Sequence, residues 1–412
     1  MKKFVVAAGA LGVCSLALVS CGPKENSDGL KASKIGFIIA GNIGDEMRGF
    51  QAAWKEVAEQ YNATLIYEQF QGQDPSYYKT CAENLISQEV DAIICNFEMA
   101  GKENVAELCI KEKVYFGYSG STLTDEQFEK YASNPYFVGQ VSPSAAVEEN
   151  EAYKMTKYYI EKYYVNESTP LPAGTNGTFG VWPVDFHGIT LEHQMTYRYK
   201  GMKKALAEYG VTINGDDQFD SSKWTATYGE NTPARLKDNV VFLGNNMAAM
   251  DALINQCSGI FSKKPSVVVT TCMGDFLMDM FASQGSQFGV LANNCEFGTI
   301  DGFTKAYDKW YVADAANPVS AYKFAHTPYL VGKYNAINVP MLALTIKAVN
   351  GQAVRDNGKA VSIDQTYLVA TNKEEFEAAK EKSTSFKFTK EQLDNIKSVK
   401  DVEDLFASVT LK

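Results

Sequence analysis

The chain has few of the residues and none of the motifs on which most enzymes depend. Only three histidines occur in 412 residues, and there is no P-loop, H-E-x-x-H or G-x-S-x-G pattern. His187 and His193 are six residues apart, a poor spacing for one helix face, and no third histidine lies nearby in the sequence. We therefore predict no catalytic activity, no metal and no cofactor, with an extracytoplasmic enzyme kept as a rival interpretation.

The chain also lacks any C-x-x-C pair, which argues against a zinc or redox motif. Eight cysteines are present, of which Cys14 lies in the apolar N-terminal run and Cys21 directly follows that run. We expect the other six to be buried free thiols, and Cys272 and Cys295, which each end a predicted strand, are the pair best placed for a disulfide. These six are Cys81, Cys95, Cys109, Cys257, Cys272 and Cys295.

Basic residues are outnumbered by acidic ones, 39 to 49, which gives a formal net charge of -10. An acidic chain does not suit nucleic acid, which is bound through basic patches. Apolar residues make up 45% of the sequence and aromatic residues 12%, enough to fill two cores. A chain of this length is expected to divide into two lobes.

No apolar run is long enough for a lasting transmembrane helix, which needs about 20 apolar residues. The run from Phe4 to Val19 follows Lys2 and Lys3, and this order is typical of a secretory signal, residues 1–20. The segment Leu18 to Cys21 resembles a bacterial lipobox, and the resemblance implies that Cys21 is lipidated, with acyl chains such as palmitate anchoring the mature protein outside the cytoplasm. A chance cysteine after an ordinary signal is the alternative. The polar residues 21–33 that follow predict a flexible tether.

The body of the chain alternates short apolar runs with amphipathic segments, which predicts parallel sheets covered by helices on both faces. We therefore predict an α/β fold with two doubly wound parallel-sheet lobes. Residues 223–246 fit no element, Pro340 is expected to kink or interrupt a helix from Tyr329 to Val349, and residues 372–412 are predicted to form a helical C-terminal extension outside the main lobes. The strands are expected at 35–40, 64–69, 92–95, 114–118, 136–141, 178–182, 211–213, 266–270 and 288–291.

Several stretches of the chain, taken in order, resemble the type I periplasmic solute-binding family, whose best-known members bind ribose and related sugars. The matching stretches are Cys81 to Asn96, Arg198 to Met202, Gly298 to Gly302, Phe324 to Gly332 and Ala343 to Val354. The resemblance implies a hinge of three crossings, near Ser142, His326 and residues 351–361. It implies a first lobe of 34–142 plus 327–352, a second of 143–326 plus 353–371, and an ABC permease in the membrane as partner.

Ligands of open parallel sheets bind beyond the carboxyl ends of the strands, so we expect polar residues at strand ends to line the site. The loop from Gly41 to Arg48 has no aromatic residue for stacking on a sugar ring, which departs from the family's sugar binders. Glu296 is one place away from the family's carboxylate, and His326 occupies a position where a glutamine is usual. The predicted ligand-binding residues are Asn42, Asp45, Glu46, Asn96, Glu98, Ser119, Trp182, Asp185, Arg198, Trp224, Asp275, Glu296 and His326.

Several of these residues also have a structural interpretation, and His326 is a candidate structural residue of the hinge. Asp45 and Asp275 are placed to cap helices, Arg198 to pair with a surface carboxylate, and Trp182 and Trp224 to fill the core. The predicted function is a monomeric, lipid-anchored receptor that closes around a sugar, polyol or nucleoside and delivers it to an ABC importer. A nucleoside-binding lipoprotein and a ligand sensor for a membrane kinase are the alternatives.

Overall fold

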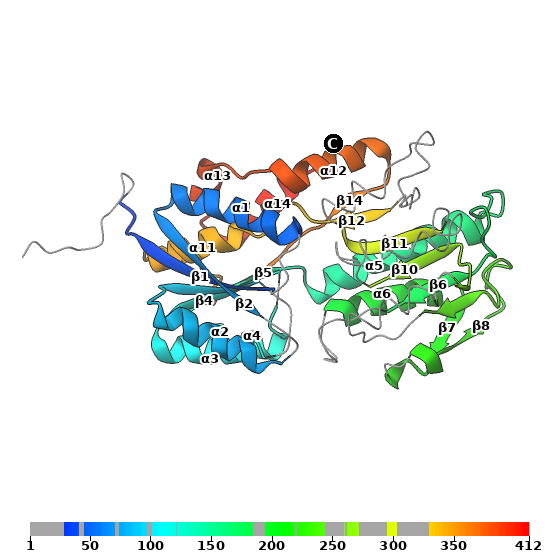
Figure 1. Cartoon of the computed structure of the whole chain (residues 1–412), viewed down its shortest axis with the longest axis horizontal. Coiled ribbons are helices and arrows are strands. Elements are labelled where there is room, and N and C mark those ends of the chain that lie inside the picture. The colour runs from blue at the N-terminus through cyan, green and yellow to red at the C-terminus, as the bar shows by residue number, and fades with distance from the viewer. Residues whose placement is uncertain are drawn as a thin grey trace, which may run out of the picture.

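The computed structural model describes residues 29–40, 45–70, 74–96, 101–120, 122–183, 194–218, 221–243, 259, 262–271, 295–302 and 329–411. These residues form two lobes, each built on a six-stranded sheet (Figure 1). The α/β architecture with two mainly parallel sheets agrees with the prediction. None of the described helices is long and apolar enough to cross a membrane.

The first sheet is parallel throughout, with the order β13-β5-β4-β3-β1-β2. Every residue of its central strand β3 is buried, as expected for a strand covered on both faces. Its strands are β1 (Ser33–Ala40), β2 (Ala63–Phe70), β3 (Ala92–Asn96), β4 (Tyr115–Ser119), β5 (Phe137–Ser142) and β13 (Val361–Asp364).

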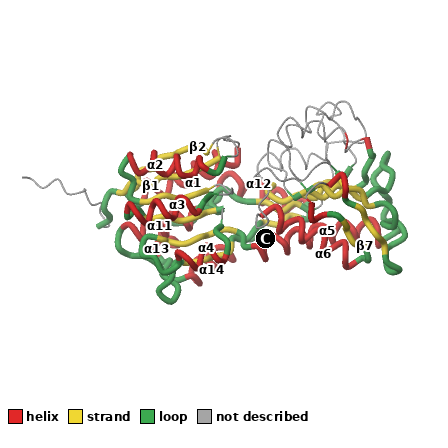
Figure 2. Tube along the Cα trace, turned by 90° about the horizontal axis from the view of Figure 1, so that it is seen from below, coloured by secondary structure: helices red, strands yellow, loops and turns green. Residues whose placement is uncertain are grey.

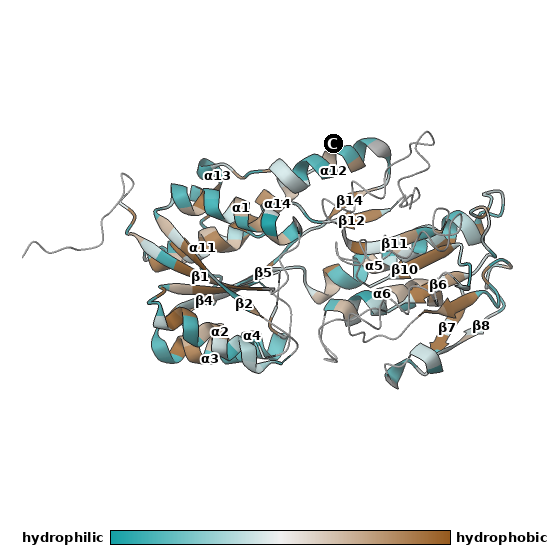
Figure 3. Ribbon diagram, in the orientation of Figure 1, coloured by the Kyte–Doolittle hydropathy of each residue, from teal (hydrophilic) through white to brown (hydrophobic). Residues whose placement is uncertain are grey.

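The helices of the first lobe cover both faces of this sheet, with α1, α11 and α13 above it and α2, α3 and α4 below it in Figure 1, and Figure 2 shows the same lobe from below. One apolar core contains residues of α1, α11 and α14, and a second contains residues of α2, α3 and α4. In Figure 3 the strands are largely hydrophobic and the outer faces of the helices hydrophilic. These helices are α1 (Asp45–Gln60), α2 (Ser76–Ser87), α3 (Glu103–Glu112), α4 (Asp125–Tyr131), α11 (Val339–Val349), α13 (Lys390–Asp394) and α14 (Val399–Ser408).

The second sheet has the order β14-β12-β11-β10-β6-β9 and is parallel except at β14. Helices α5 and α6 pack closely together over one face of this sheet, and α12 contacts β14. The elements are β6 (Phe179–Trp182), β9 (Val240–Phe242), β10 (Val267–Thr270), β11 (Glu296–Gly302), β12 (Leu330–Gly332), β14 (Leu368–Ala370), α5 (Ala145–Ile160) with a π-helical turn (Glu161–Val165), α6 (Gln194–Glu208) and α12 (Lys373–Ser385).

The segment that matched no predicted element contains strands. Residues 223–246 hold β9 and β8 (Thr225–Tyr228), which pairs antiparallel with β7 (Val211–Asn214) in a separate small sheet. Alternate residues of β8 are exposed, and the strand is only four residues long, so no apolar run marked it. Two 3-10 turns, Asp216–Gln218 and Ser221–Lys223, connect β7 to β8.

The chain passes between the two sheets three times. The first passage, 143–144, agrees with the prediction near Ser142, because β5 belongs to the first sheet and α5 to the second lobe. The second passage, 333–338, joins β12 to α11, and the third, 365–367, joins β13 to β14. We call these three passages the hinge.

The predicted lobe boundaries need two corrections. Residues 330–332 pair with β11 in the second sheet, although 327–352 had been assigned to the first lobe. Residues 361–364 pair with β5 in the first sheet, although 353–371 had been assigned to the second lobe. Both strands are only three or four residues long, too short to leave a clear pattern in the sequence.

Two further predictions about the last third of the chain are corrected. The helix predicted from Tyr329 begins only at Val339, with Pro340 in its first turn, where the missing N–H of proline costs no hydrogen bond. The C-terminal extension does not stay outside the lobes, because Leu393, Val402 and Phe406 are buried in the core of the first lobe.

Candidate functional site

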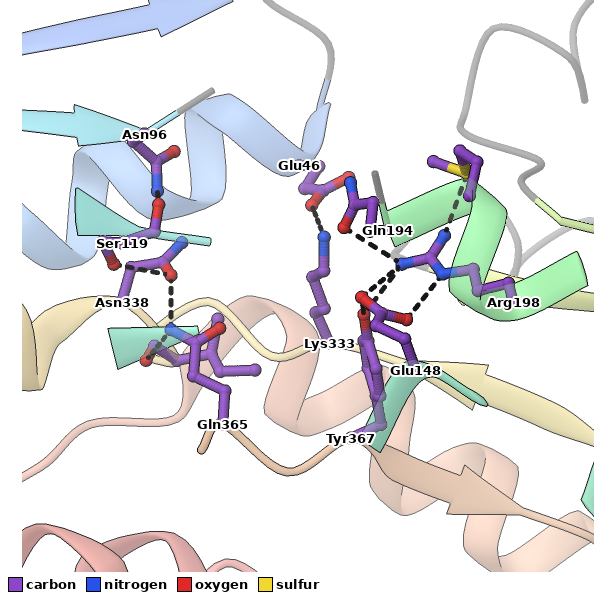
Figure 4. A network of polar contacts seen from close by, with 12 residues as sticks. Glu46, Asn96, Ser119, Glu148, Gln194, Arg198, Lys333, Asn338, Gln365 and Tyr367 are labelled. Atoms are coloured by element: carbon purple, nitrogen blue, oxygen red, sulfur yellow. Dashed lines mark hydrogen bonds and ion pairs between the residues drawn. The ribbon is translucent and has the colours of Figure 1, made fainter. Parts of the chain in front are cut away.

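The carboxyl ends of both parallel sheets face the hinge. The first passage leaves β5 at its carboxyl end, the third leaves β13 at its carboxyl end, and the second leaves β12 at its carboxyl end. Since ligands of parallel sheets bind at these ends, the residues around the three passages form the candidate site. Figure 4 shows the polar side chains there.

A chain of hydrogen bonds, which we call the amide cluster, joins Asn96, Ser119, Asn338 and Gln365. The Asn96 amide nitrogen donates to the Ser119 carbonyl oxygen at 2.7 Å, and the Ser119 hydroxyl donates to Asn338 Oδ1 at 3.0 Å. Gln365 Nε2 donates to the same Asn338 oxygen at 2.8 Å. All four residues are at most 7% exposed, so the cluster fixes the orientation of each amide in a buried setting.

The amide cluster has two acceptors and one donor that no described residue uses. Asn96 Oδ1 and Asn338 Nδ2 carry no contact in Figure 4, and their own bonds fix which end of each amide is free. Gln365 Oε1 is buried and also lacks a donor among the described residues. A hydroxyl group both donates and accepts, so it matches such a pair of amide atoms.

Gly120 leaves space beside the amide groups of Asn96 and Asn338, because it has no side chain. Gly120 has a φ of 64°, and a Cβ atom there would lie 3.3 Å from Asn96 Nδ2 and 3.6 Å from Asn338 Oδ1. A side chain would therefore be strained and would crowd both amides.

The second polar group, which we call the arginine cluster, contains Glu148, Arg198 and Tyr367. Arg198 Nε and Nη2 donate to the two carboxylate oxygens of Glu148 at 2.6 and 3.0 Å. Nη2 also donates to the Tyr367 hydroxyl at 2.8 Å, and Nη1 donates to the Thr271 carbonyl oxygen at 3.0 Å. The Tyr367 hydroxyl in turn donates to Glu148 at 2.8 Å.

The arginine cluster gives Arg198 a structural role at the hinge. Arg198 is 0% exposed and joins the start of α5, the third passage and the end of β10. The surface pairing considered for it from the sequence is thus replaced by a buried, bidentate ion pair. Gly201 follows within one helical turn, and its missing Cβ allows the close contact, because a Cβ there would lie 2.0 Å from the Glu149 carbonyl oxygen.

A third polar contact connects the second passage to the first turn of α1. Lys333 Nζ lies 3.3 Å from Glu46 Oε1, with side chains 16% and 25% exposed. Glu46 was predicted from the sequence, whereas Lys333 was not. The pair lies beside the other two groups in Figure 4.

The structure does not bring the tryptophans together as stacking platforms. Trp182 ends β6 at its carboxyl end but is 0% exposed. Trp224 packs against Tyr199 and Phe242 in the core of the second lobe, directly before β8 of the small sheet. The prediction for Trp224 is corrected, because its position in this core serves packing.

Glu296 lies at the wrong end of its strand for the site. It begins β11, whose start is aligned with the start of β10, so it is at the amino ends of the strands. Lys162 Nζ lies 3.4 Å from its carboxylate and the Tyr163 hydroxyl donates to it. Burial raises the pKa of this carboxyl group, and those two contacts oppose the rise. The prediction that Glu296 contacts ligand is corrected to a structural role.

Of the remaining predicted residues, one begins a helix and the others lie outside the described ranges. Asp45 is the first residue of α1. Among the described residues, no group of three histidine, cysteine, aspartate or glutamate side chains could hold a metal ion, and Cys81, Cys95, Cys109 and Cys295 are buried free thiols. The other predicted residues, Asn42, Glu98, Asp185, Asp275, His326 and Cys21, lie outside the described residues.

This chain is similar to known proteins in its structure and not in its sequence. No family model matches the sequence, and no curated protein matches it. Solved structures do match. A solute-binding protein of an ABC transporter from Actinobacillus succinogenes 130z, with bound D-allose, has a TM-score of 0.56 at 15% identity, covering 86% of this chain and 100% of its own. The fold is that of a type I periplasmic solute-binding protein.

Two more structures of this kind match over similar lengths. An ABC transporter solute-binding protein from Bacillus halodurans C-125, with bound myo-inositol, has a TM-score of 0.55 at 15% identity, over 85% of this chain and 98% of its own. The arabinose-binding component from Shewanella sp. ANA-3, bound to L-arabinofuranose, also has a TM-score of 0.55 at 15% identity, over 88% and 98%. The periplasmic-binding-protein fold predicted from scattered motifs is thus confirmed.

Most hinge residues of this site were not predicted from the sequence. Glu148, Asn338, Gln365 and Tyr367 were not predicted, although Gln365 directly follows a strand of the first sheet. Gln365 could have been predicted from its position directly after a strand, but β13 is too short to be recognised from its sequence.

Proposed function

We propose that this protein is an extracytoplasmic receptor that binds a sugar or polyol between its lobes and delivers it, unchanged, to an ABC importer. The observation that carries the proposal is that Asn96 Oδ1, at the carboxyl end of β3, and Asn338 Nδ2, in the second passage, have no partner among the described residues, while the other end of each amide is fixed by hydrogen bonds. The bound D-allose, myo-inositol and arabinofuranose of structures with the same fold support this ligand class.

The proposed mechanism is closure about the three passages. A ligand that contacts both lobes shifts the equilibrium toward the closed form by its difference in affinity for the two forms. The amide cluster belongs to the first lobe and the passages, and the arginine cluster anchors the second lobe to the same passages. The receptor is proposed to act as a monomer held to a membrane by acyl chains on Cys21.

A ligand screen tests the proposed function on the mature chain without its lipid. Sugars, polyols, nucleosides and amino acids are compared by thermal shift, followed by calorimetry of those that stabilise. A ligand at about a hundred times its Kd adds about 2.7 kcal/mol, which corresponds to roughly 5 to 10 °C for a lobe of 150–250 residues that unfolds by itself. Stabilisation by nucleosides alone would favour the nucleoside-binding alternative, and chemical change of the bound compound on long incubation would favour an enzyme.

A matched pair of variants tests the amide atoms. Asn338→Asp keeps the oxygen that accepts from Ser119 and Gln365 but removes the Nδ2 donor, so we expect about a tenfold loss of affinity for the ligand. Asn395→Asp makes the same exchange on an exposed residue of the C-terminal extension and should leave affinity unchanged. Equal affinities for both variants would contradict the role of Asn338.

Lipid attachment is tested separately. Growth with labelled palmitate should label the wild-type protein and leave the Cys21→Ser variant unlabelled. A neighbouring permease gene or a neighbouring kinase gene distinguishes transport from the sensor alternative.

A further inference from the structure

The C-terminal extension makes a fourth connection between the lobes. β14 belongs to the second sheet, α12 follows it and contacts it, and residues 386–411 then pack on the first lobe. In Figure 1 the extension runs along one side of both lobes, over the hinge. The three passages of the hinge are therefore accompanied by a segment anchored at both ends.

The anchor on the first lobe is extensive. The Tyr61 hydroxyl donates to the Asp394 carboxylate at 2.7 Å, and Lys347 Nζ donates to the Asp394 and Ile396 carbonyl oxygens at 2.8 and 2.6 Å. Leu393 and Ile396 are at most 1% exposed within the apolar core of that lobe. These contacts fix the end of α13 and the residues after it to α11 and to the end of α1.

The anchor on the second lobe is β14, which pairs with β12, together with α12, which contacts β14. Asn372 caps this helix by accepting from the Glu375 N–H, directly after β14. Phe376 and Ala379 on its inner face are 3% and 0% exposed. The helix is therefore packed down, and its end at Ser385 is the start of the span to the first lobe.

Between the anchors the extension packs directly on the second passage. The ring of Tyr334 lies edge-on to Phe386 at 5.3 Å and to Phe388 at 6.3 Å between centroids. Asn335 Nδ2 donates to the Thr384 carbonyl oxygen at 3.5 Å. Tyr334 is 1% exposed, so the backbone that must turn during hinge motion is covered by the extension.

We propose that the C-terminal extension is a strap that stiffens the hinge and narrows the range of lobe angles that the ligand-free protein samples. Rotation of the lobes changes the backbone of the second passage, and the close-packed Tyr334, Phe386 and Phe388 rings must slide or separate for that change to occur. A segment anchored on both lobes also limits how far its two ends move apart. This inference does not depend on the identity of the ligand.

The test lengthens the segment between α12 and α13 and leaves the contacts of both helices in place. A flexible Gly/Ser insert of about 12 residues after Ser385 adds about 20 Å of reach, while α12 stays on the second lobe and Phe386 stays with α13. Spin labels on a non-canonical amino acid at the exposed positions Lys79 and Lys200, one in each lobe, report the interlobe distance by pulsed electron resonance. The same insert between Asn357 and Gly358, an exposed turn of the first lobe, is the matched control.

We expect a broader distribution of interlobe distances in the variant with the insert after Ser385 than in the wild type. The control variant should have the same narrow distribution as the wild type. A protease site placed within the Ser385 insert gives a second measurement on one preparation, since the folded protein is measured before and after the strap is cut. Unchanged distributions in the slackened and cut proteins overturn the proposal, as does equal broadening in the control.

Discussion

The buried ion pair between Arg198 and Glu148 yields the sharpest prediction, because it separates a structural role from a ligand-binding one. Replacing Arg198 by methionine keeps the apolar part of the side chain but removes the guanidinium group. Glu148, 1% exposed, then loses both its bonds from Arg198 and keeps the Tyr367 hydroxyl. The carbonyl oxygen of Thr271 loses its arginine donor as well.

The size of the effect follows from taking the guanidinium partner away from a buried carboxylate. Breaking a buried pair by removing one partner costs about 3–5 kcal/mol, and for a domain of 150–250 residues each kcal/mol lowers Tm by roughly 2–4 °C. We therefore expect Arg198→Met to unfold roughly 6–20 °C below wild type. Replacing Glu148 by methionine in the same chain should restore part of this loss, since the buried carboxylate is then removed together with its guanidinium partner.

The assay is thermal and urea unfolding followed by tryptophan fluorescence, which Trp182 and Trp224 report from the second lobe. Lys359→Met removes one partner of an exposed pair, Lys359 and Glu129 at 2.7 Å, and should cost about 1 kcal/mol or less. The reasoning is refuted if Arg198→Met unfolds like this control while ligand affinity falls sharply.

Three further predictions concern the packing and titration of single residues. Gly201→Ala should lower Tm by forcing α5 and α6 apart, whereas Gly259→Ala, where a Cβ meets nothing within 4 Å, should not; equal Tm values would contradict the packing argument. Burial raises the pKa of the Cys81 thiol to about 11, so this thiol should be alkylated slowly at pH 8 in the folded protein and quickly in urea, as mass spectrometry would detect. Burial likewise raises the pKa of Tyr67 to about 12, so its contribution to stability is complete below pH 10 and is lost as the pH rises toward 12. Tyr67→Phe should flatten the decline in unfolding free energy over that range, and the exposed Tyr77→Phe should not.

The sequence predicted the first lobe well because its strands are long enough to show their burial. β1 has eight residues and β3 is buried throughout, so both produced clear apolar runs. β12 and β13 have three and four residues, and their pairing is decided by distant partners in the sheets. A short strand has no local pattern of its own, so the second and third crossings of the hinge were placed several residues away from the passages.

The candidate site was predicted in outline and missed in detail for the same reason. Asn96 and Ser119 end clear strands of the first lobe and were found, while Asn338 and Gln365 belong to passages whose position was misjudged. Arg198 was found by its motif, but the sequence did not reveal Glu148 as its partner, 50 residues away. Contacts of that separation depend on how two helices pack, which composition and periodicity do not specify.

The order of segments in the first lobe has a consequence for how the chain is made. Its sheet needs β13 near residue 361, and its apolar core needs Phe406, hundreds of residues after β1. Contacts so distant in sequence form late and slowly, and a ribosome releases the early strands long before their partners exist. A nascent chain of this design stays unfinished until its final helices emerge, and loss of even the last few dozen residues leaves its earliest strands without a completed core.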